Sequence, residues 1–257
     1  MSYPKIVFIV PYRNRENDKI HFEVYIKYLL EDYSPHEYEI YYSYQNDMRA
    51  FNRGAIKNIG FLAIRNKYPE HYKNITFVFN DIDILPIRKN LLNYETSNGI
   101  VKHYYGFDYA LGGIFSITGE DFEKIKGFPN YWGWGYEDNV INNRCIENNI
   151  QIDRSNFYKI FNNNFVQTSV SNKKVINNQK PDINNSKNNN LNTISNLDYN
   201  IDGNIINVNK FDTIEDYNLA KFYEQDLKDN SKIVINKELH NQLQQKKNRL
   251  NMRNMRI

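Results

Sequence analysis

The sequence Phe-Val-Phe-Asn-Asp-Ile-Asp-Ile-Leu-Pro at residues 77–86 gives the strongest structural signal in this chain. Its continuous apolar start predicts a strand that is buried on both faces. Asp81 and Asp83 would be costly inside such a strand, so we expect them at its carboxyl end, where open α/β sheets bind ligands. Carboxylates two residues apart share one side of an extended backbone and suit Mg²⁺ or Mn²⁺ carrying a diphosphate. Short acidic pairs also occur in many turns, so a metal site is supported only if other parts of the chain supply further ligand-binding residues.

The residues before this strand alternate between strand and helix patterns. Ile6 to Val10 and Glu39 to Tyr44 are short apolar or aromatic runs that predict strands. His21 to Leu30 has apolar residues at helical spacing, and an apolar helix is expected after Arg53. This alternation predicts an α/β fold with a right-handed, mostly parallel central sheet flanked by helices.

The later part of the chain is less regular. The expected elements are a strand over 100–104, a turn into a strand over 110–117, a helix over 121–125 capped by Thr118, and a helix over 140–150. Beyond them we expect a strand over 205–208, a helix over 216–227 and a basic helix over 236–257. The Asn- and Lys-rich segment 173–192 predicts a long loop, which is either a result of biased composition or a functional lid.

The composition predicts a soluble protein with a sizeable core. Hydrophobic residues make up 40% of the 257 residues, and Cys145 is the single cysteine, so there is no disulfide framework. The net charge of +3 argues neither for nor against a nucleic-acid partner, but the first half has no basic stripe with interleaved aromatics, and we expect no such partner. No apolar run has the length of a membrane span, and the chain starts with a strand pattern rather than a signal peptide. We expect a cytoplasmic protein without a transmembrane segment, of viral or bacterial origin.

Basic residues stand where an anionic ligand would meet the predicted sheet. Arg13 and Arg15 directly follow the first strand, and Arg53 precedes the second helix. Arginines at the ends of parallel strands and at a helix N-terminus can bind phosphate groups. An exposed basic turn is the alternative interpretation of the first two.

The segment 131–139, Tyr-Trp-Gly-Trp-Gly-Tyr-Glu-Asp-Asn, contains both tryptophans of the chain. Large rings separated by glycine do not build a regular element, but aromatic faces stack on the apolar faces of sugars. The following Glu137 and Asp138 could accept hydrogen bonds from hydroxyl groups, and one of them could act as a general base. A packed aromatic loop followed by acids in the first turn of a helix remains an alternative.

Together these segments resemble the β-1,4-galactosyltransferase family of inverting, metal-dependent glycosyltransferases with a GT-A type fold. The resemblance spans about residues 4–160 and is carried by the segments 11–15, 51–53, 77–86, 112–113 and, most specifically, 127–138. It implies a Rossmann-like sheet and a mobile tryptophan loop. It also implies a catalytic domain over residues 1–210, with a donor-binding part at about 1–90 and an acceptor-binding part at about 105–160. Residues 211–257 would form a helical, basic extension.

The resemblance also implies roles for individual residues. Asp138 would be the catalytic base and Glu137 would orient sugar groups. A UDP-sugar donor would be bound by Arg13, Arg15, Phe51, Arg53, Asp81, Asp83, Gly112, Gly113 and Trp134. A sugar or glycoconjugate acceptor would be bound by Ala110, Trp132, Trp134, Tyr136 and Asn139. Asp83 would ligate Mn²⁺, with Mg²⁺ as the other cation that fits. The hexose transferred would be galactose or an N-acetylhexosamine.

The sequence departs from the family at several of these positions. The family has a later histidine metal ligand that is missing near residues 162–171, which leaves Gln167 or an asparagine in that run as a replacement. A tyrosine of the galactose-specific members is Ala110 here, and the smaller side chain leaves room for an N-acetyl group. A metal-poor sugar- or nucleotide-binding pseudoenzyme is therefore the alternative function. The sequence predicts no oligomeric state.

Overall fold

The computed structural model describes residues 3–168, 173–177, 187–226 and 232–234. Within them the helices are α1 (Glu16–Leu29), α2 (Arg53–Lys67), α3 (Gly119–Lys124) and α4 (Glu137–Glu147), with the 3₁₀ turns η1 (Tyr72–Asn74) and η3 (Leu191–Thr193). The strands of the first half are β1 (Ile6–Tyr12), β2 (Tyr38–Gln45), β3 (Thr76–Asn80), β4 (Ile84–Pro86), β5 (Ile100–Gly106) and β6 (Ile114–Thr118). Those of the second half are β7 (Gln151–Asp153), β8 (Tyr158–Lys159), β9 (Phe165–Gln167), β10 (Lys173–Asn177), β11 (Ser195–Asp202), β12 (Ile205–Asp212), β13 (Phe222–Asp226) and β14 (Lys232–Val234).

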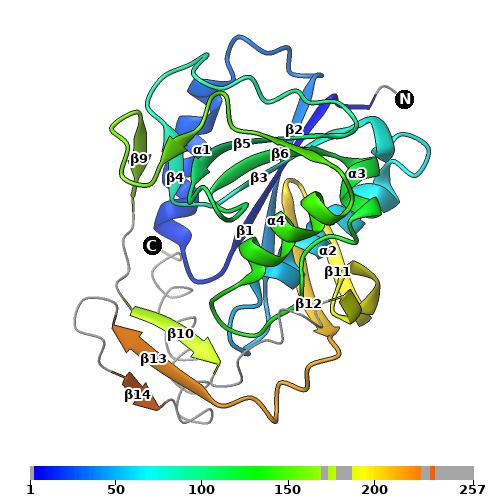
Figure 1. The fold of residues 1–257 in the computed structure, drawn as a ribbon, viewed down its shortest axis with the longest axis vertical. Helices are drawn as coiled ribbons and strands as arrows, with labels where there is room; N and C mark the ends of the chain where they lie inside the picture. Colours follow the sequence, from blue (N-terminus) through cyan, green and yellow to red (C-terminus); the bar gives the residue numbers. More distant parts are fainter. Residues whose placement is uncertain (1–2, 169–172, 178–186, 227–231, 235–257) are drawn as a thin grey trace.

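A mixed but mostly parallel sheet forms the centre of the molecule (Figure 1). Its strands run in the order β11-β12-β2-β1-β3-β6-β5-β7, and β8 pairs with β5 outside this path. β1 is parallel to both of its neighbours, β12 is parallel to β2, and β7 and β8 are parallel to β5. Antiparallel pairing joins β3 to β6, β6 to β5 and β11 to β12. The α/β class predicted from the sequence is confirmed.

The alternation of side chains along β1 builds a core on each face of this sheet. Val7 and Ile9 belong to one buried cluster, which includes most of the apolar residues of α2. Phe8 and Val10 belong to the other, together with Phe22 of α1. Successive residues of a strand face opposite sides, so a strand between two helical layers must be apolar at every position. This explains the continuous apolar runs of the sequence.

The N-terminus of α2 is held tightly against the chain before α4. The Asn52 side chain accepts a hydrogen bond from the backbone N–H of Ala55 at 2.9 Å and donates one to the carbonyl oxygen of Asn130 at 2.9 Å. Gly54 has no room for a side chain, because a Cβ atom there would lie 2.0 Å from the carbonyl oxygen of Pro129. These contacts place Arg53, the first residue of α2, beside the start of α4.

The second half differs from the sequence prediction in several elements, and among them the short strands β7, β8, β9 and β14 were not predicted. The helix expected over 216–227 is wrong, because β13 occupies 222–226 and pairs with β10 and β14. Backbone pairing with other segments outweighs a short helical pattern. The segment 173–192, expected to be a loop, contains β10 and η3, and the strand β11 was not predicted. The helix expected over 236–257 lies outside the described residues. The division near residue 210 stays a prediction, although β12 continues to Asp212.

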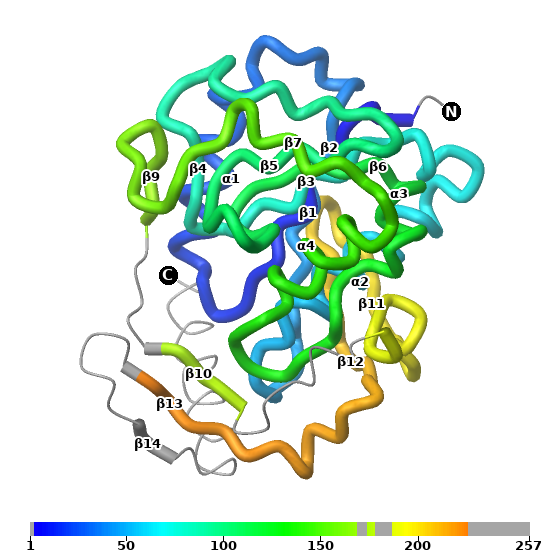
Figure 2. The backbone as a smooth tube through the Cα atoms, viewed as in Figure 1, coloured from blue at the N-terminus to red at the C-terminus, as the bar shows by residue number. Residues whose placement is uncertain are grey.

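The strands β10, β13 and β14 form a small sheet of their own, apart from the central sheet. Figure 2 shows this small sheet at the lower left and β1 at the centre of the molecule. Within the part of the chain that the structure describes, no helix has the length and apolar character needed to cross a membrane.

Candidate active site

A cavity of about 500 Å³ opens where the carboxyl ends of β1 and β3 meet the N-termini of α2 and α4. This is the edge at which open α/β sheets bind ligands. The predicted site residues that line it are Arg13, Arg15, Phe51, Arg53, Asp81, Asp83, Ala110, Gly112, Gly113, Trp134, Glu137 and Asp138. Asp83 and Asp138, which are 55 positions apart in the sequence, therefore face one shared space.

Arg53 connects three carboxylates from different parts of this cavity. Its Nε donates to Glu137 Oε1 at 2.8 Å, and its Nη1 donates to Asp81 Oδ2 at 2.8 Å. Its Nη2 donates to Asp138 Oδ2. A planar guanidinium with five donors can hold several oxygens in fixed directions, so Arg53 sets the relative position of the three acids.

Lys57, one helical turn after Arg53, adds a second positive charge beneath the same acids. Its side chain is 1% exposed, and Nζ lies 3.5 Å from Asp81 Oδ1 and 3.6 Å from Asp138 Oδ1. Burial opposes the ionisation of Asp81, but Arg53 and Lys57 outweigh it and lower the pKa of this carboxyl below its ordinary value. At Asp138 burial prevails over both cations, and the pKa is raised. Asp138 is thus the better proton acceptor near neutral pH.

The Gly112–Gly113 pair allows the backbone to approach Asp138 closely. A Cβ atom on Gly112 would lie 2.7 Å from Asp138 Oδ2, and one on Gly113 would lie 2.3 Å from the carbonyl oxygen of Tyr105. Gly113 also has a φ of +66°, which favours glycine. The backbone N–H of Leu111 donates to the carbonyl oxygen of Asp138 at 2.9 Å. Two glycines are therefore required here by contacts within the protein, and their role in binding the donor stays a prediction.

Behind these glycines, a buried histidine fixes the backbone. His103 Nε2 lies 3.1 Å from the carbonyl oxygens of both Tyr105 and Gly112, and Nδ1 accepts a hydrogen bond from Arg154 Nε at 3.0 Å. Because Arg154 can only donate, His103 is neutral and carries its proton on Nε2. Burial, together with the charge of Arg154, lowers the pKa of His103 to about 4.

Asp83 is paired with Arg15, whose Nη2 donates to Asp83 Oδ2 at 3.0 Å, while Arg15 Nε donates to Asp18 at 2.5 Å. Burial and the nearby Asp81 raise the pKa of Asp83. Gln167 lies next to it: β9 pairs with β4, and the backbone N–H of Thr168 donates to the carbonyl oxygen of Asp83 at 2.9 Å.

Gln167 Oε1 is buried, lies in a side chain that lines the cavity, and has no hydrogen-bond partner within the described residues. An amide oxygen beside a carboxylate suits a hard divalent cation that takes its other ligands from phosphate and water. Among the residues described, no three His, Cys, Asp or Glu side chains are grouped to hold a metal by themselves. The donors present therefore fit a cation that a phosphorylated ligand helps to bind.

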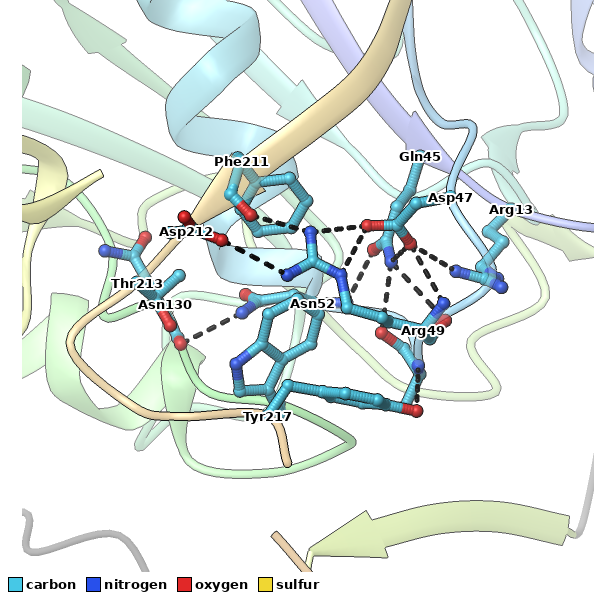
Figure 3. Close-up of polar contacts among 12 residues, drawn as sticks. Arg13, Gln45, Asp47, Arg49, Asn52, Asn130, Phe211, Asp212, Thr213 and Tyr217 are labelled. Atoms are coloured by element: carbon cyan, nitrogen blue, oxygen red, sulfur yellow. Dashed lines mark hydrogen bonds and ion pairs between the residues drawn. The ribbon is translucent and has the colours of Figure 1, made fainter. Parts of the chain in front are cut away.

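A polar network supports Arg13 from behind (Figure 3). Asp47 accepts from Arg13 Nη1 at 3.3 Å and from Arg49 Nε at 2.6 Å, and Gln45 Nε2 donates to the same carboxylate at 2.7 Å. Tyr217 accepts a hydrogen bond on its hydroxyl from the backbone N–H of residue 50, the neighbour of the cavity residue Phe51. Residues after β12 thus help to hold the phosphate-binding edge predicted from the sequence.

Three of the residues predicted to bind an acceptor do not line the cavity. Trp132 is 2% exposed, its ring stacks on Phe211 with centroids 5.3 Å apart, and its Nε1 donates to the carbonyl oxygen of Glu215. Tyr136 precedes α4 with a φ of +68° and is 49% exposed outside the cavity lining. Asn139 lies on α4, also outside the lining.

Other residues of the site were not predicted. Lys57 could have been found, because it follows Arg53 by four positions and so shares its helix face. His103 and Lys174 gave no such signal, since one lies inside an apolar strand and the other in an Asn- and Lys-rich segment. The cavity lining also includes Tyr105, Phe107 and Val175.

The comparisons with known proteins agree with this geometry. A family model described as the N-terminal region of glycosyl transferase group 7 matches residues 1–95, and one described as the N-terminal domain of galactosyltransferase matches residues 96–166. β-1,4-galactosyltransferase 1 of Mus musculus is 30% identical over 165 residues, which cover 61% of this chain and 40% of the relative. The xylosylprotein 4-β-galactosyltransferase of Caenorhabditis elegans is 28% identical over 162 residues, covering 60% of this chain and 54% of the relative.

Solved structures show the same fold. The catalytic domain of Drosophila β-1,4-galactosyltransferase 7 in complex with xylobiose superposes with a TM-score of 0.64 at 23% identity, covering 84% of this chain and 96% of that one. A mutant of that enzyme in complex with manganese, UDP-Gal and xylobiose gives 0.60 at 21% identity, with the same coverage. This chain spans about half the length of the relatives it matches in sequence, between 40% and 54% for the two named above. These relatives are animal proteins and give no support to a viral or bacterial origin.

The low pKa of His103 predicts a loss of stability in mild acid. Between pH of about 6.5 and the folded-state pKa of about 4, the unfolded chain binds a proton at this residue that the folded protein does not. The free energy of unfolding should therefore fall by roughly 3 kcal/mol from this group alone as the pH drops through that window. Urea unfolding at several pH values measures it. His103→Gln should flatten the dependence, and His36→Gln, at an exposed position, should leave it intact.

Proposed function

Because the chain belongs to the β-1,4-galactosyltransferase family, we propose that it is an inverting glycosyltransferase that moves a hexose from a UDP-sugar to a sugar hydroxyl. The observation that carries the proposal is the shared cavity of Asp83 and Asp138, with arginines at its rim. An anion-binding edge on one side and a partly unpaired carboxylate on the other are what a transfer away from a diphosphate requires.

The names of the relatives indicate the substrates to test. The C. elegans relative is named for transfer to a xylosylprotein, and the Drosophila structure contains manganese, UDP-Gal and xylobiose. We propose UDP-Gal or a UDP-N-acetylhexosamine as the donor of this chain, and a saccharide or glycoconjugate as its acceptor.

The donor would lie along the edge formed by β1, β3 and α2. Arg13 and Arg15 follow β1, and both line the cavity beside Phe51. Their guanidinium groups can bind phosphate oxygens in a bidentate way and stabilise the negative charge that grows on the leaving diphosphate. Asp83 and Gln167 would hold Mn²⁺ or Mg²⁺. When bound, this cation would also stabilise the negative charge on the diphosphate.

Asp138 is suited to be the general base. Its Oδ2 is fixed by Arg53, whereas Oδ1 is buried and has no hydrogen-bond partner within the described residues. The carboxylate of Asp138, which lines the cavity, would accept the proton of the acceptor hydroxyl as that oxygen forms its bond to the anomeric carbon. The bond between the anomeric carbon and the diphosphate breaks on the opposite face, so the configuration inverts. Lys57, 3.6 Å from Oδ1, would hold the carboxylate in place during the transfer.

Ala110 would set the choice of donor. It lines the cavity next to the backbone that touches Asp138 and is 5% exposed. A methyl group there leaves space for an N-acetyl substituent, whereas a larger side chain would fill that space. We therefore propose that UDP-N-acetylhexosamines are accepted at least as well as UDP-Gal.

Asp138→Asn should lower turnover by roughly 10²- to 10⁴-fold, because an amide cannot take the proton, while the affinity for UDP stays nearly unchanged. The raised pKa of Asp138 also predicts that kcat/KM of the unmodified protein falls with decreasing pH before the range of an ordinary aspartate is reached. Transfer assays across pH test both points. Asp198→Asn, an exposed carboxylate on β11, is the matched control, and normal turnover by Asp138→Asn would rule out the assigned base.

Removing divalent cations separates the enzyme from the pseudoenzyme. With MnCl₂ we expect transfer, or slow hydrolysis, of a UDP-sugar, and with EDTA we expect the rate to fall by at least about tenfold. Gln167→Ala should raise the concentration of Mn²⁺ needed for half-maximal rate, since it removes a proposed oxygen ligand. If the protein binds UDP but releases no sugar from any donor, in MnCl₂ or in EDTA, it is a binding protein and not an enzyme.

Ala110→Tyr should shift donor preference toward UDP-Gal by about tenfold or more, because the added ring occupies the space proposed for an N-acetyl group. A panel of UDP-Gal, UDP-GlcNAc and UDP-GalNAc, compared by kcat/KM, measures this shift. Ala110→Ser adds one atom and should leave the ratios near those of the original protein. Unchanged ratios in the tyrosine variant would remove Ala110 as the specificity residue.

A further inference from the structure

A lysine from the small sheet lines the proposed donor site. Lys174 lies on β10 and lines the cavity together with Val175. β10 belongs to residues beyond the 1–166 that match the family models, so the resemblance assigns no role to it. The electrostatic neighbours of Lys174 are the charged groups at the centre of the site, Asp83, Asp81, Arg53 and Arg15.

Lys174 differs from the arginines of the cavity because it forms no ion pair with any acid of the described residues. Arg53 contacts three carboxylates, Arg15 contacts Asp83, and Arg13 contacts Asp47. Within the described residues, the ammonium of Lys174 makes no ion pair. Burial is the main cause that lowers the pKa of Lys174. A partly buried cation that forms no ion pair within the described residues would be stabilised further by an anionic ligand.

The tryptophan loop holds this lysine in place. The backbone N–H of Trp134 donates to the carbonyl oxygen of Val175 at 2.8 Å, and Lys174 Nζ lies 5.9 Å from the centroid of the Trp134 ring. Gly133 permits the contact, because a Cβ atom there would lie 3.0 Å from the carbonyl oxygen of Val175. The other side of β10 is fixed by antiparallel pairing to β13. Lys174 is thus positioned by two neighbours rather than lying free on a surface.

We infer that Lys174 binds the diphosphate of the donor and, together with the β1 arginines, neutralises the leaving group. The inference rests on the proposed function, since it names a further residue of the same site. The strand β10 brings the positive charge of Lys174 to the cavity that the arginines also line. An ammonium can serve as such a point charge for a phosphate oxygen, without the bidentate geometry of arginine.

Binding of UDP and of uridine to the full chain, by calorimetry with MnCl₂, tests the inference. Lys174→Met removes the charge and keeps the length of the side chain. It should weaken the binding of UDP by about ten- to a hundredfold and leave the binding of uridine unchanged. The slope of log Kd for UDP against log salt concentration should also become shallower. Lys174→Arg should restore most of the affinity. The control is Lys210→Met, which replaces an exposed lysine of β12. It removes the same net charge away from the cavity and should change the affinity for neither UDP nor uridine.

Two results would overturn the role of Lys174. One is an unchanged affinity of Lys174→Met for UDP, and the other is an equal loss for UDP and uridine, which would indicate a general disturbance of the site. Equal thermal unfolding of the Met variants of Lys174 and Lys210 shows that both are folded. If the unmodified protein binds UDP no better than uridine, the proposed function fails instead, and the two failures are therefore distinguishable.

Discussion

The guanidinium of Arg53 is the interaction on which the rest of the site depends. It binds Asp81 after β3 and Glu137 and Asp138 at the start of α4, and it belongs itself to the first turn of α2. Removing such a charge from water is costly, yet the three acids keep the pKa of Arg53 well above its ordinary value. Without this group, three carboxylates would repel one another across one cavity. The carboxyl edge of the sheet and the N-termini of two helices are thus joined by one side chain.

This arrangement gives neighbouring acids different roles. Glu137 is 3% exposed, and its two oxygens are taken by Arg53 and by the backbone N–H of Gly135, so it fixes the tryptophan loop. Asp138, the next residue, has one oxygen without a hydrogen-bond partner within the described residues, as Asp81 has, but the pKa of Asp138 is raised by burial. Asp81 is held ionised by two cations and is part of the scaffold. Environments that separate the pKa values of nearby acids are typical of sites that move protons.

The sequence predicted the sheet and the charged edge because both follow from short-range patterns. The acids that follow the apolar strand β3 and the arginines that follow β1 had to meet, since the ends of parallel strands lie at one edge. The sequence could not predict that Trp132 is buried in the core whereas Trp134 lines the cavity. The glycines between and after them take φ values of +87° and +130°, so the direction of each ring depends on packing far along the chain. Trp132 is buried by Phe211, which follows it by 79 positions in the sequence. For the same reason the sequence predicts a helix over 216–227 where β13 forms, because the pairing of β13 with β10 depends on residues far away in the sequence.

The cavity is built from two parts of the chain with different physical requirements. Residues up to 166 supply the acids and arginines, whose distances must be fixed within a fraction of an ångström for proton transfer and charge stabilisation. Later residues supply Gln167, Lys174 and Val175 at the cavity and Phe211 and Tyr217 behind it. Apart from the proposed metal ligand Gln167, these residues contribute packing and one positive charge. Since Val175 also contacts Trp134, a change in the later residues would alter the position of Trp134 at the cavity while Arg53 keeps its acids in place.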